Sequence, residues 1–125
     1  MKSAKFPTPS DEKNPSKLYV IAHSLALNTV NNLAGVYESQ GRYAEAEMLY
    51  KRVLRSQEQQ LGSDHPSVLT TMHNLASVYE SQGRYAEAKK LYNRVLPSLE
   101  EQLGSDHVDV LATKRRLASV STHAD

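Results

Sequence analysis

Apolar residues between Val68 and Leu103 recur at the three- and four-residue intervals of two amphipathic helices. The first helix carries its apolar face on Val68, Met72, Leu75, Ala76 and Tyr79. The second carries it on Tyr85, Ala88, Leu91, Tyr92, Val95, Leu96, Leu99 and Leu103. This spacing is typical of helices that bury one face and expose the other. Gly83 and Gly104 follow the two apolar runs and are expected to end each helix in a left-handed conformation.

The same pattern is repeated at an offset of 42 residues. Residues 32–65 and 74–107 (74 − 32 = 42) are identical at 27 of 34 positions, and Leu117–Val120 begins a third copy of Leu75–Val78. We therefore expect a repeat domain over 17–125, with units 23–64 and 65–106 and a capping half-repeat over 107–122. Residues 1–16, which contain three prolines among polar residues, are expected to form a disordered tail.

The connections between the predicted helices are short, so consecutive helices must be antiparallel neighbours. The fold class is therefore all-α, with five helices in about two and a half helix–turn–helix repeats. Alanines in the middle of these helices would let the axes approach closely, and the repeated tyrosines would fill the core with their hydroxyls reaching solvent. The repeated histidines His23, His65 and His107 are expected at helix starts. Pro97 is expected to kink or end its helix early.

The run Asn-Leu-Ala-x-Val-Tyr-x-x-Gln-Gly-Arg-Tyr-x-Glu-Ala-x-x-Leu-Tyr-x-Arg-x-Leu, followed by Leu-Gly-x-Asp-His-Pro, begins at Asn32. It resembles the 42-residue tetratricopeptide repeat of kinesin light chains and related proteins. The resemblance covers about Ala22 to Val120. It implies a short right-handed α-solenoid whose first helices line a concave groove that holds peptides. This motif is specific for the fold and names no particular partner.

The first helices of such an array face the groove, and their polar residues are the candidate peptide-binding residues. Asn32 and Asn74 occupy the same repeat position, and an amide both donates to and accepts from a peptide backbone. The resemblance agrees, because related repeats grip peptide backbone with such asparagines. The alternative is that these amides bond neighbouring helix ends or water. The full candidate set is Asn28, Asn31, Asn32, Thr70, His73, Asn74, Arg115 and Arg116.

Two arginines at the C-terminal end of the predicted groove bear on the choice of ligand. Arg115 and Arg116 would favour acidic or carboxylate-bearing peptides, although a solvated face of a capping helix explains them equally well. Asn31 and Gly35 stand where the carboxylate clamp of chaperone-binding relatives needs lysine and asparagine. A receptor for C-terminal carboxylates is therefore disfavoured.

Composition narrows the remaining function classes. The formal net charge is +1 and the chain has no cysteine, so a basic nucleic-acid surface, a disulfide framework and a thiolate metal site are not expected. No apolar run has the length of a membrane span. The histidines lack metal-ligand spacing, each glycine is isolated, and no catalytic constellation stands out. We expect no enzyme activity, no cofactor and no metal, and a cytoplasmic location.

A second hypothesis is that the chain is a self-associating structural element or part of a larger repeat scaffold. About three repeats are normally needed for stability, and nothing resembling a capping repeat precedes the first unit. Leu18, Tyr19, Val20 and Ile21 are apolar. They could lengthen the first helix, cover the open end of the stack, or pair with another copy.

Overall fold

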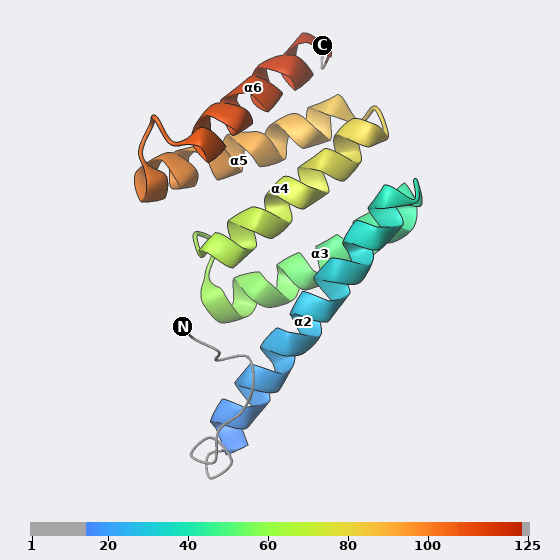
Figure 1. Ribbon diagram of the computed structural model, residues 1–125, viewed down its shortest axis with the longest axis vertical. Helices are drawn as coiled ribbons and strands as arrows, with labels where there is room; N and C mark the ends of the chain where they lie inside the picture. The colour runs from blue at the N-terminus through green and yellow to red at the C-terminus, as the bar shows by residue number, and fades with distance from the viewer. Residues whose placement is uncertain (1–14, 124–125) are drawn as a thin grey trace.

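The computed structural model describes residues 15–123, which form five helices and no strand (Figure 1). The helices are α2 (Pro15–Ser39), α3 (Tyr43–Leu61), α4 (Pro66–Ser81), α5 (Tyr85–Leu103) and α6 (Val108–His123). Each helix packs against its neighbour in the chain, and α2 also touches α4. The predicted all-α fold of stacked antiparallel helices is confirmed.

The helices are connected by short turns of two kinds, which alternate along the chain. Gly41 and Gly83 adopt φ of 78° and 75°, and the following amides donate back to Tyr37 and Tyr79 carbonyl oxygens at 2.8 Å. These bonds close the turns within each pair of helices. The turns between pairs end in histidine caps, because His65 Nδ1 accepts from the Ser67 amide at 3.1 Å. His107 Nδ1 accepts from the Asp109 amide in the same way.

His23 departs from this pattern and corrects the prediction of a third histidine cap. It lies inside α2, which begins at Pro15, and its ring stacks on Tyr19 with a centroid separation of 5.8 Å. The reason is the segment before it. His65 follows Gly62, whose φ is 87°, whereas the apolar residues before His23 continue the helix. Pro15 and Ser16, expected in the tail, also belong to α2, and the predicted tail over 1–14 lies outside the described residues.

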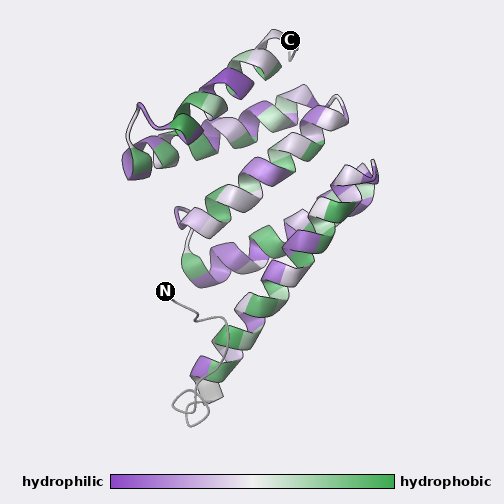
Figure 2. Cartoon of the chain, viewed as in Figure 1, coloured by the Kyte–Doolittle hydropathy of each residue, from purple (hydrophilic) through white to green (hydrophobic). Residues whose placement is uncertain are grey.

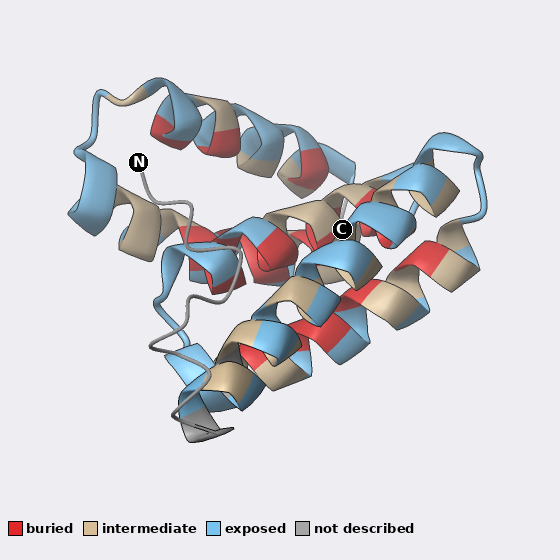
Figure 3. Cartoon of the chain, turned by 60° about the horizontal axis from the view of Figure 1, so that its bottom comes forward, coloured by how far each residue is buried: buried red, intermediate tan, exposed pale blue. Residues whose placement is uncertain are grey.

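The core runs along the lines where neighbouring helices meet, and the end helices are exposed on their outer sides (Figure 3). Ala34, Ala46, Ala76 and Ala88 are fully buried, as close approach of the helix axes requires. The tyrosines fill the space beside them, but their hydroxyls are not simply solvated. Instead, the buried Tyr50 and Tyr92 donate to the carboxylates of Glu38 and Glu80, respectively.

An ion pair and a hydrogen bond at the surface join the two repeats. Arg84 Nη1 lies 2.7 Å from Glu47 Oε1, and the Tyr79 hydroxyl donates to the other oxygen of the same carboxylate at 3.3 Å. Burial raises the pKa of Glu47, but hydrogen bonds from Lys51 and Arg84 outweigh this effect and hold the pKa below its ordinary value. The carboxylate is therefore charged at neutral pH and ties α3 to the turn before α5.

Pro97 does not end α5 early, so that part of the prediction is wrong. The helix continues to Leu103, and it has the same 19 residues as α3, which carries Arg55 at the equivalent position. Pro97 is exposed, and Leu91, Tyr92 and Val95 anchor the preceding turns in the core. Packing on both neighbouring helices therefore maintains the helix through the proline.

We expect the exchange Pro97→Arg to stabilise the chain by about 1–3 kcal/mol, because it restores a backbone donor and removes a clash inside the helix. The reciprocal change Arg55→Pro should destabilise by about 3 kcal/mol at an exposed site of the same repeat position. Urea unfolding measures both. Equal midpoints for wild type and Pro97→Arg would show that α5 accommodates the proline without cost.

Two glycines provide a second pair of substitutions with opposite expected signs. Gly83→Ala should destabilise by about 1–2 kcal/mol, because φ of 75° is unfavourable for a side chain. Gly35→Ala should stabilise by about 0.5–1 kcal/mol, since Gly35 is helical and the added Cβ would lie an ordinary 3.6 Å from the Tyr50 hydroxyl. Thermal unfolding by circular dichroism distinguishes the two signs.

Candidate functional site

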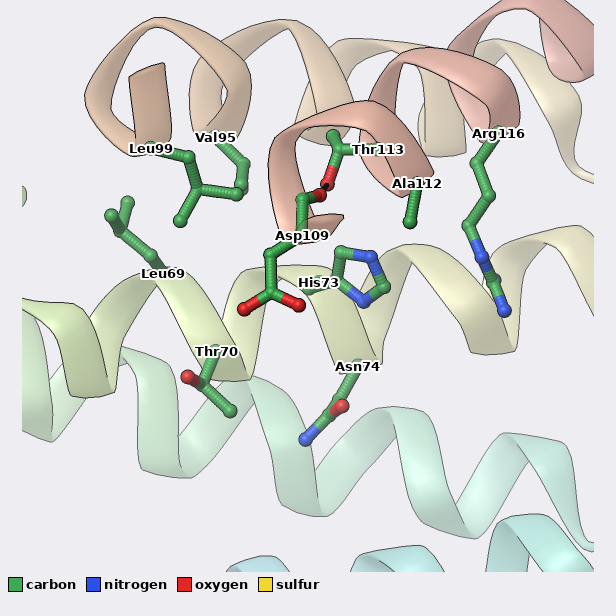
Figure 4. Close-up of a pocket in the computed structure, with 10 residues that line it drawn as sticks. All are labelled: Leu69, Thr70, His73, Asn74, Val95, Leu99, Asp109, Ala112, Thr113 and Arg116. Atoms are coloured by element: carbon green, nitrogen blue, oxygen red, sulfur yellow. Dashed lines mark hydrogen bonds between the residues drawn. The ribbon is translucent and has the colours of Figure 1, made fainter. Parts of the chain in front are cut away.

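A pocket of about 330 Å³ lies among side chains of α4, α5 and α6. Its volume falls at the lower end of the range for ligand pockets, about 300–1,000 Å³. Apolar side chains from α4, α5 and α6 and polar side chains from α4 and α6 form its walls (Figure 4). The lining residues are Leu69, Thr70, His73, Asn74, Val95, Leu99, Asp109, Ala112, Thr113 and Arg116.

The structure brings four of the eight predicted site residues together in this pocket: Thr70, His73, Asn74 and Arg116. Arg115 is exposed on α6 and does not line it. Asn28 and Asn32 are exposed on α2, at the repeat positions of Thr70 and Asn74. The predicted set is therefore split between the pocket and the first helix.

Asn31 is the prediction that tertiary packing alters most. Its Nδ2 donates to the Thr71 hydroxyl on α4 at 3.3 Å, and that hydroxyl donates to Gln57 Oε1 on α3 at 2.7 Å. Thr71 and Gln57 are buried. Asn31 thus belongs to a polar contact between helices rather than to an open groove surface. Its Oδ1 is buried and has no hydrogen-bond partner among the described residues.

The second junction has different residues at these positions, and the pocket lies there. A shift of 42 residues converts Asn31, Gln57 and Thr71 into His73, Leu99 and Thr113. The Leu99 side chain has no polar atom that Thr113 could bond. The Thr113 hydroxyl donates to the Asp109 carbonyl oxygen of its own helix at 2.9 Å. The His73 ring turns toward Tyr92, with its centroid 5.4 Å from the tyrosine ring in an edge-to-face contact. The hydrogen-bonded contact of the first junction is thus replaced by a partly apolar recess.

His73 is the titratable group at the centre of this recess. Burial lowers the pKa of His73, and the positive charge of Arg116 lowers it further, while Glu80 and Asp109 oppose the shift. Figure 4 shows the ring beside the Asp109 carboxylate, under Ala112. The imidazole is therefore neutral at pH 7 and offers one donor and one acceptor to a ligand.

Arg116 is already engaged by the protein. Its Nη1 lies 3.1 Å from Glu80 Oε1 and 3.2 Å from the Tyr92 hydroxyl. Burial and the hydrogen bond to Glu80 raise the pKa of Tyr92 well above its ordinary value, so the phenol stays protonated. The pairing with Glu80 reduces the free positive charge that Arg116 presents to the pocket.

Five residues of the site were not among those predicted from the sequence. They are three apolar residues, one carboxylate and one hydroxyl: Leu69, Val95, Leu99, Asp109 and Thr113. The replacement of Gln57 by Leu99 was the available signal, because it is a polar-to-apolar change at a position facing another helix. Asp109 gave no such signal. It is brought to the pocket by the packing of α6 against α5.

These features define a helical repeat protein with an inter-repeat pocket, and comparison with known proteins identifies the repeat. The model of the tetratricopeptide repeat family matches residues 25–101 and 73–124. The chain belongs to this family, which confirms the resemblance seen in the sequence. Tetratricopeptide repeats generally mediate protein–protein interaction and are typically non-enzymatic scaffolds.

Solved structures agree with this assignment. One similar structure is a Podosopora anserina protein described as a kinesin light chain with nearly identical TPR-like repeats, at 28% identity and a TM-score of 0.75. A single-substitution variant of that protein matches equally well. The match covers 87% of this chain but only 56% of that one. No curated protein matches this chain.

The described residues, 15–123, offer neither a metal site nor a helix that could span a membrane. In this part of the chain no group of three or more histidine and acidic side chains is arranged to hold a metal ion. None of the described helices combines the length and apolar character that crossing a membrane requires.

The low pKa of His73 predicts how stability depends on pH. A group with a folded pKa below its unfolded value favours unfolding when it is protonated, so stability is highest above about pH 6.5 and falls as the pH drops through that value. His73→Asn, which introduces the residue of the first repeat, should flatten this part of the profile. Unfolding free energies at pH 7.5 and pH 5 test this, and an NMR titration should place the His73 pKa below that of free histidine.

Proposed function

We propose that this chain binds an extended peptide segment of a partner protein along the exposed side of its first helices. One apolar side chain of the peptide enters the pocket between α4, α5 and α6. The observation that carries the proposal is the pocket itself, because it contains four of the polar residues predicted from the sequence. The family's general role in protein–protein interaction supports the same conclusion.

The residues that line the pocket indicate which peptide segment would fit it. Leu69, Val95, Leu99 and Ala112 offer apolar surface, and burying an apolar side chain there contributes about 25 cal/mol per Å². Asn74 is half-buried at the edge of the pocket. Its amide is suited to pair with the N–H and C=O groups of a peptide backbone. The neutral His73 supplies one further donor or acceptor.

A preference for acidic peptides rests mainly on Arg115. It is exposed on α6, whereas the charge of Arg116 is shared with Glu80. The Asp109 side chain is 67% exposed at the pocket and repels a carboxylate placed close to it. We therefore expect acidic residues beside the pocket-binding side chain, toward Arg115, rather than inside the pocket.

The test is selection of binding peptides from a displayed library on the full chain, followed by affinity measurement on variants. Ala112→Phe fills the pocket and should weaken binding by roughly tenfold or more, about the loss of 1.4 kcal/mol. Asn74→Ala should weaken it by roughly fivefold, about the value of one hydrogen bond. Arg115→Glu should reverse any selection for acidic flanking residues.

Ala118→Phe is the matched control, because it places the same side chain on the same helix at an exposed residue that does not line the pocket. Circular dichroism verifies that both phenylalanine variants keep their helical content. Selected peptides that bind Ala112→Phe as tightly as wild type would refute the pocket as their binding site.

A further inference from the structure

The outer side of α2 carries an exposed stripe of mainly apolar residues. Its members recur at alternating intervals of three and four residues, the spacing by which one helix packs along another. All six are exposed, including Tyr19 at 65%, Leu33 at 44% and Val36 at 51%. Figure 2 shows apolar positions recurring along α2. We call this set the α2 stripe: Tyr19, Ala22, Ala26, Thr29, Leu33 and Val36.

The same repeat positions are buried in the later copies. A shift of 42 residues converts Ala26, Thr29, Leu33 and Val36 into Val68, Thr71, Leu75 and Val78, none of which is more than 3% exposed. A further shift gives Val110, Thr113, Leu117 and Val120, of which three are buried and Leu117 is half-buried. In both copies the helix packs against the preceding second helix, α3 or α5. The residues equivalent to the α2 stripe in the later copies are thus covered by a helix, whereas the α2 stripe is exposed.

Polar groups beside the stripe also match those of the covered copy. Arg42 stacks over Tyr37 at 4.2 Å, as Arg84 stacks over Tyr79 at 4.4 Å. Arg84 additionally pairs with Glu47 of the preceding helix, whereas the only ion pair of Arg42 within residues 15–123 joins it to Glu45 of its own helix pair. Arg42 is accordingly more exposed, at 48% of its side chain against 35% for Arg84.

Thr29 and Thr71, another pair at one repeat position, differ in the same way. Thr71 bonds Gln57 of the preceding helix in addition to the Ser67 carbonyl oxygen of its own helix. Within the described residues the equivalent Thr29 has only the own-helix bond, to the Leu25 carbonyl oxygen. The covering helix α3 therefore supplies a carboxylate at position 47 and, ten residues later (57 − 47 = 10), an amide oxygen. Arg42 and Thr29 would donate to the same groups on a covering helix.

We propose that the α2 stripe docks an amphipathic helix of a partner protein, lying antiparallel to α2. This helix carries a carboxylate that pairs with Arg42 and an amide that accepts from Thr29, with small and aliphatic residues between them. From Tyr19 to Val36 the stripe spans 18 residues, or about 27 Å of helix, which is close to the length of the 19-residue α3.

The continuity of α2 limits how a covering helix can be connected to it. α3 reaches its place against α4 through a tight turn that ends at His65. The equivalent residue, His23, lies within α2, which continues back to Pro15. A helix joined to α2 in the way α3 is joined to α4 is therefore excluded. The α2 stripe contains none of the residues that line the pocket between α4, α5 and α6, so the proposal does not depend on that pocket.

A peptide with the sequence of α3, Tyr43–Leu61, stapled on its exposed side to hold it helical, is the direct probe. Added to the isotope-labelled full chain, it should shift the amide resonances of the α2 stripe. A matched peptide with Glu47→Lys, the residue found at position 89 in α5, should bind roughly fivefold more weakly, the effect of one half-exposed ion pair. On the variant Arg42→Glu this preference should reverse.

Val36→Glu should abolish the shifts, whereas Val108→Glu, at an exposed valine of α6, should leave them unchanged. Both valines are exposed, and circular dichroism verifies that the variants fold. Shifts confined to the α4–α5–α6 pocket, or equal affinity for both peptides, would overturn the proposal. So would a chain that light scattering finds to be a dimer and that Val36→Glu converts to a monomer, because the occupant would then be a second copy.

Discussion

The stability of α4 and α6 depends on the preceding helix, α3 or α5, that covers their apolar residues. Val68, Leu75 and Val78 are buried because α3 lies over them, and Ala26, Leu33 and Val36 are exposed at the same positions of α2. Burial of apolar surface is the main favourable term in folding, so nearest-neighbour contact supplies most of the stabilisation in a stacked array. The buried alanines set how closely the helices approach, and the tyrosines fill the space that this approach leaves.

The two junctions between repeats are built from nearly the same sequence but differ in chemistry. In the first, Asn31, Thr71 and Gln57 form a chain of hydrogen bonds between three helices. In the second, His73 and Leu99 break that chain, and a pocket of about 330 Å³ lies there. An interface that must satisfy buried polar groups has little freedom, whereas an apolar recess with polar edges is suited to a ligand. Two substitutions thus separate a structural junction from a candidate binding site.

Much of the architecture was predictable because helical periodicity and glycine turns are local properties. The repeat spacing gave the helix order, the two buried alanine positions and the caps at His65 and His107. The same reasoning failed at His23, where apolar residues before it extend α2, and at Pro97, where tertiary packing outweighed the local cost of the proline. For the candidate site, repeat position identified Thr70, His73, Asn74 and Arg116, but gave no means of separating them from Asn31.

The sequence by itself determined the repeat, its helices and the face of each helix that is apolar, since these follow from spacing along the chain. Only the tertiary structure decided which polar residues meet. Asn31 and His73 occupy one repeat position, yet Asn31 is held between helices and His73 lines a pocket. The difference arises from residues 26 to 40 positions away in the chain, namely Gln57, Leu99 and Thr71. Contacts of that range are set by packing, which no local pattern encodes.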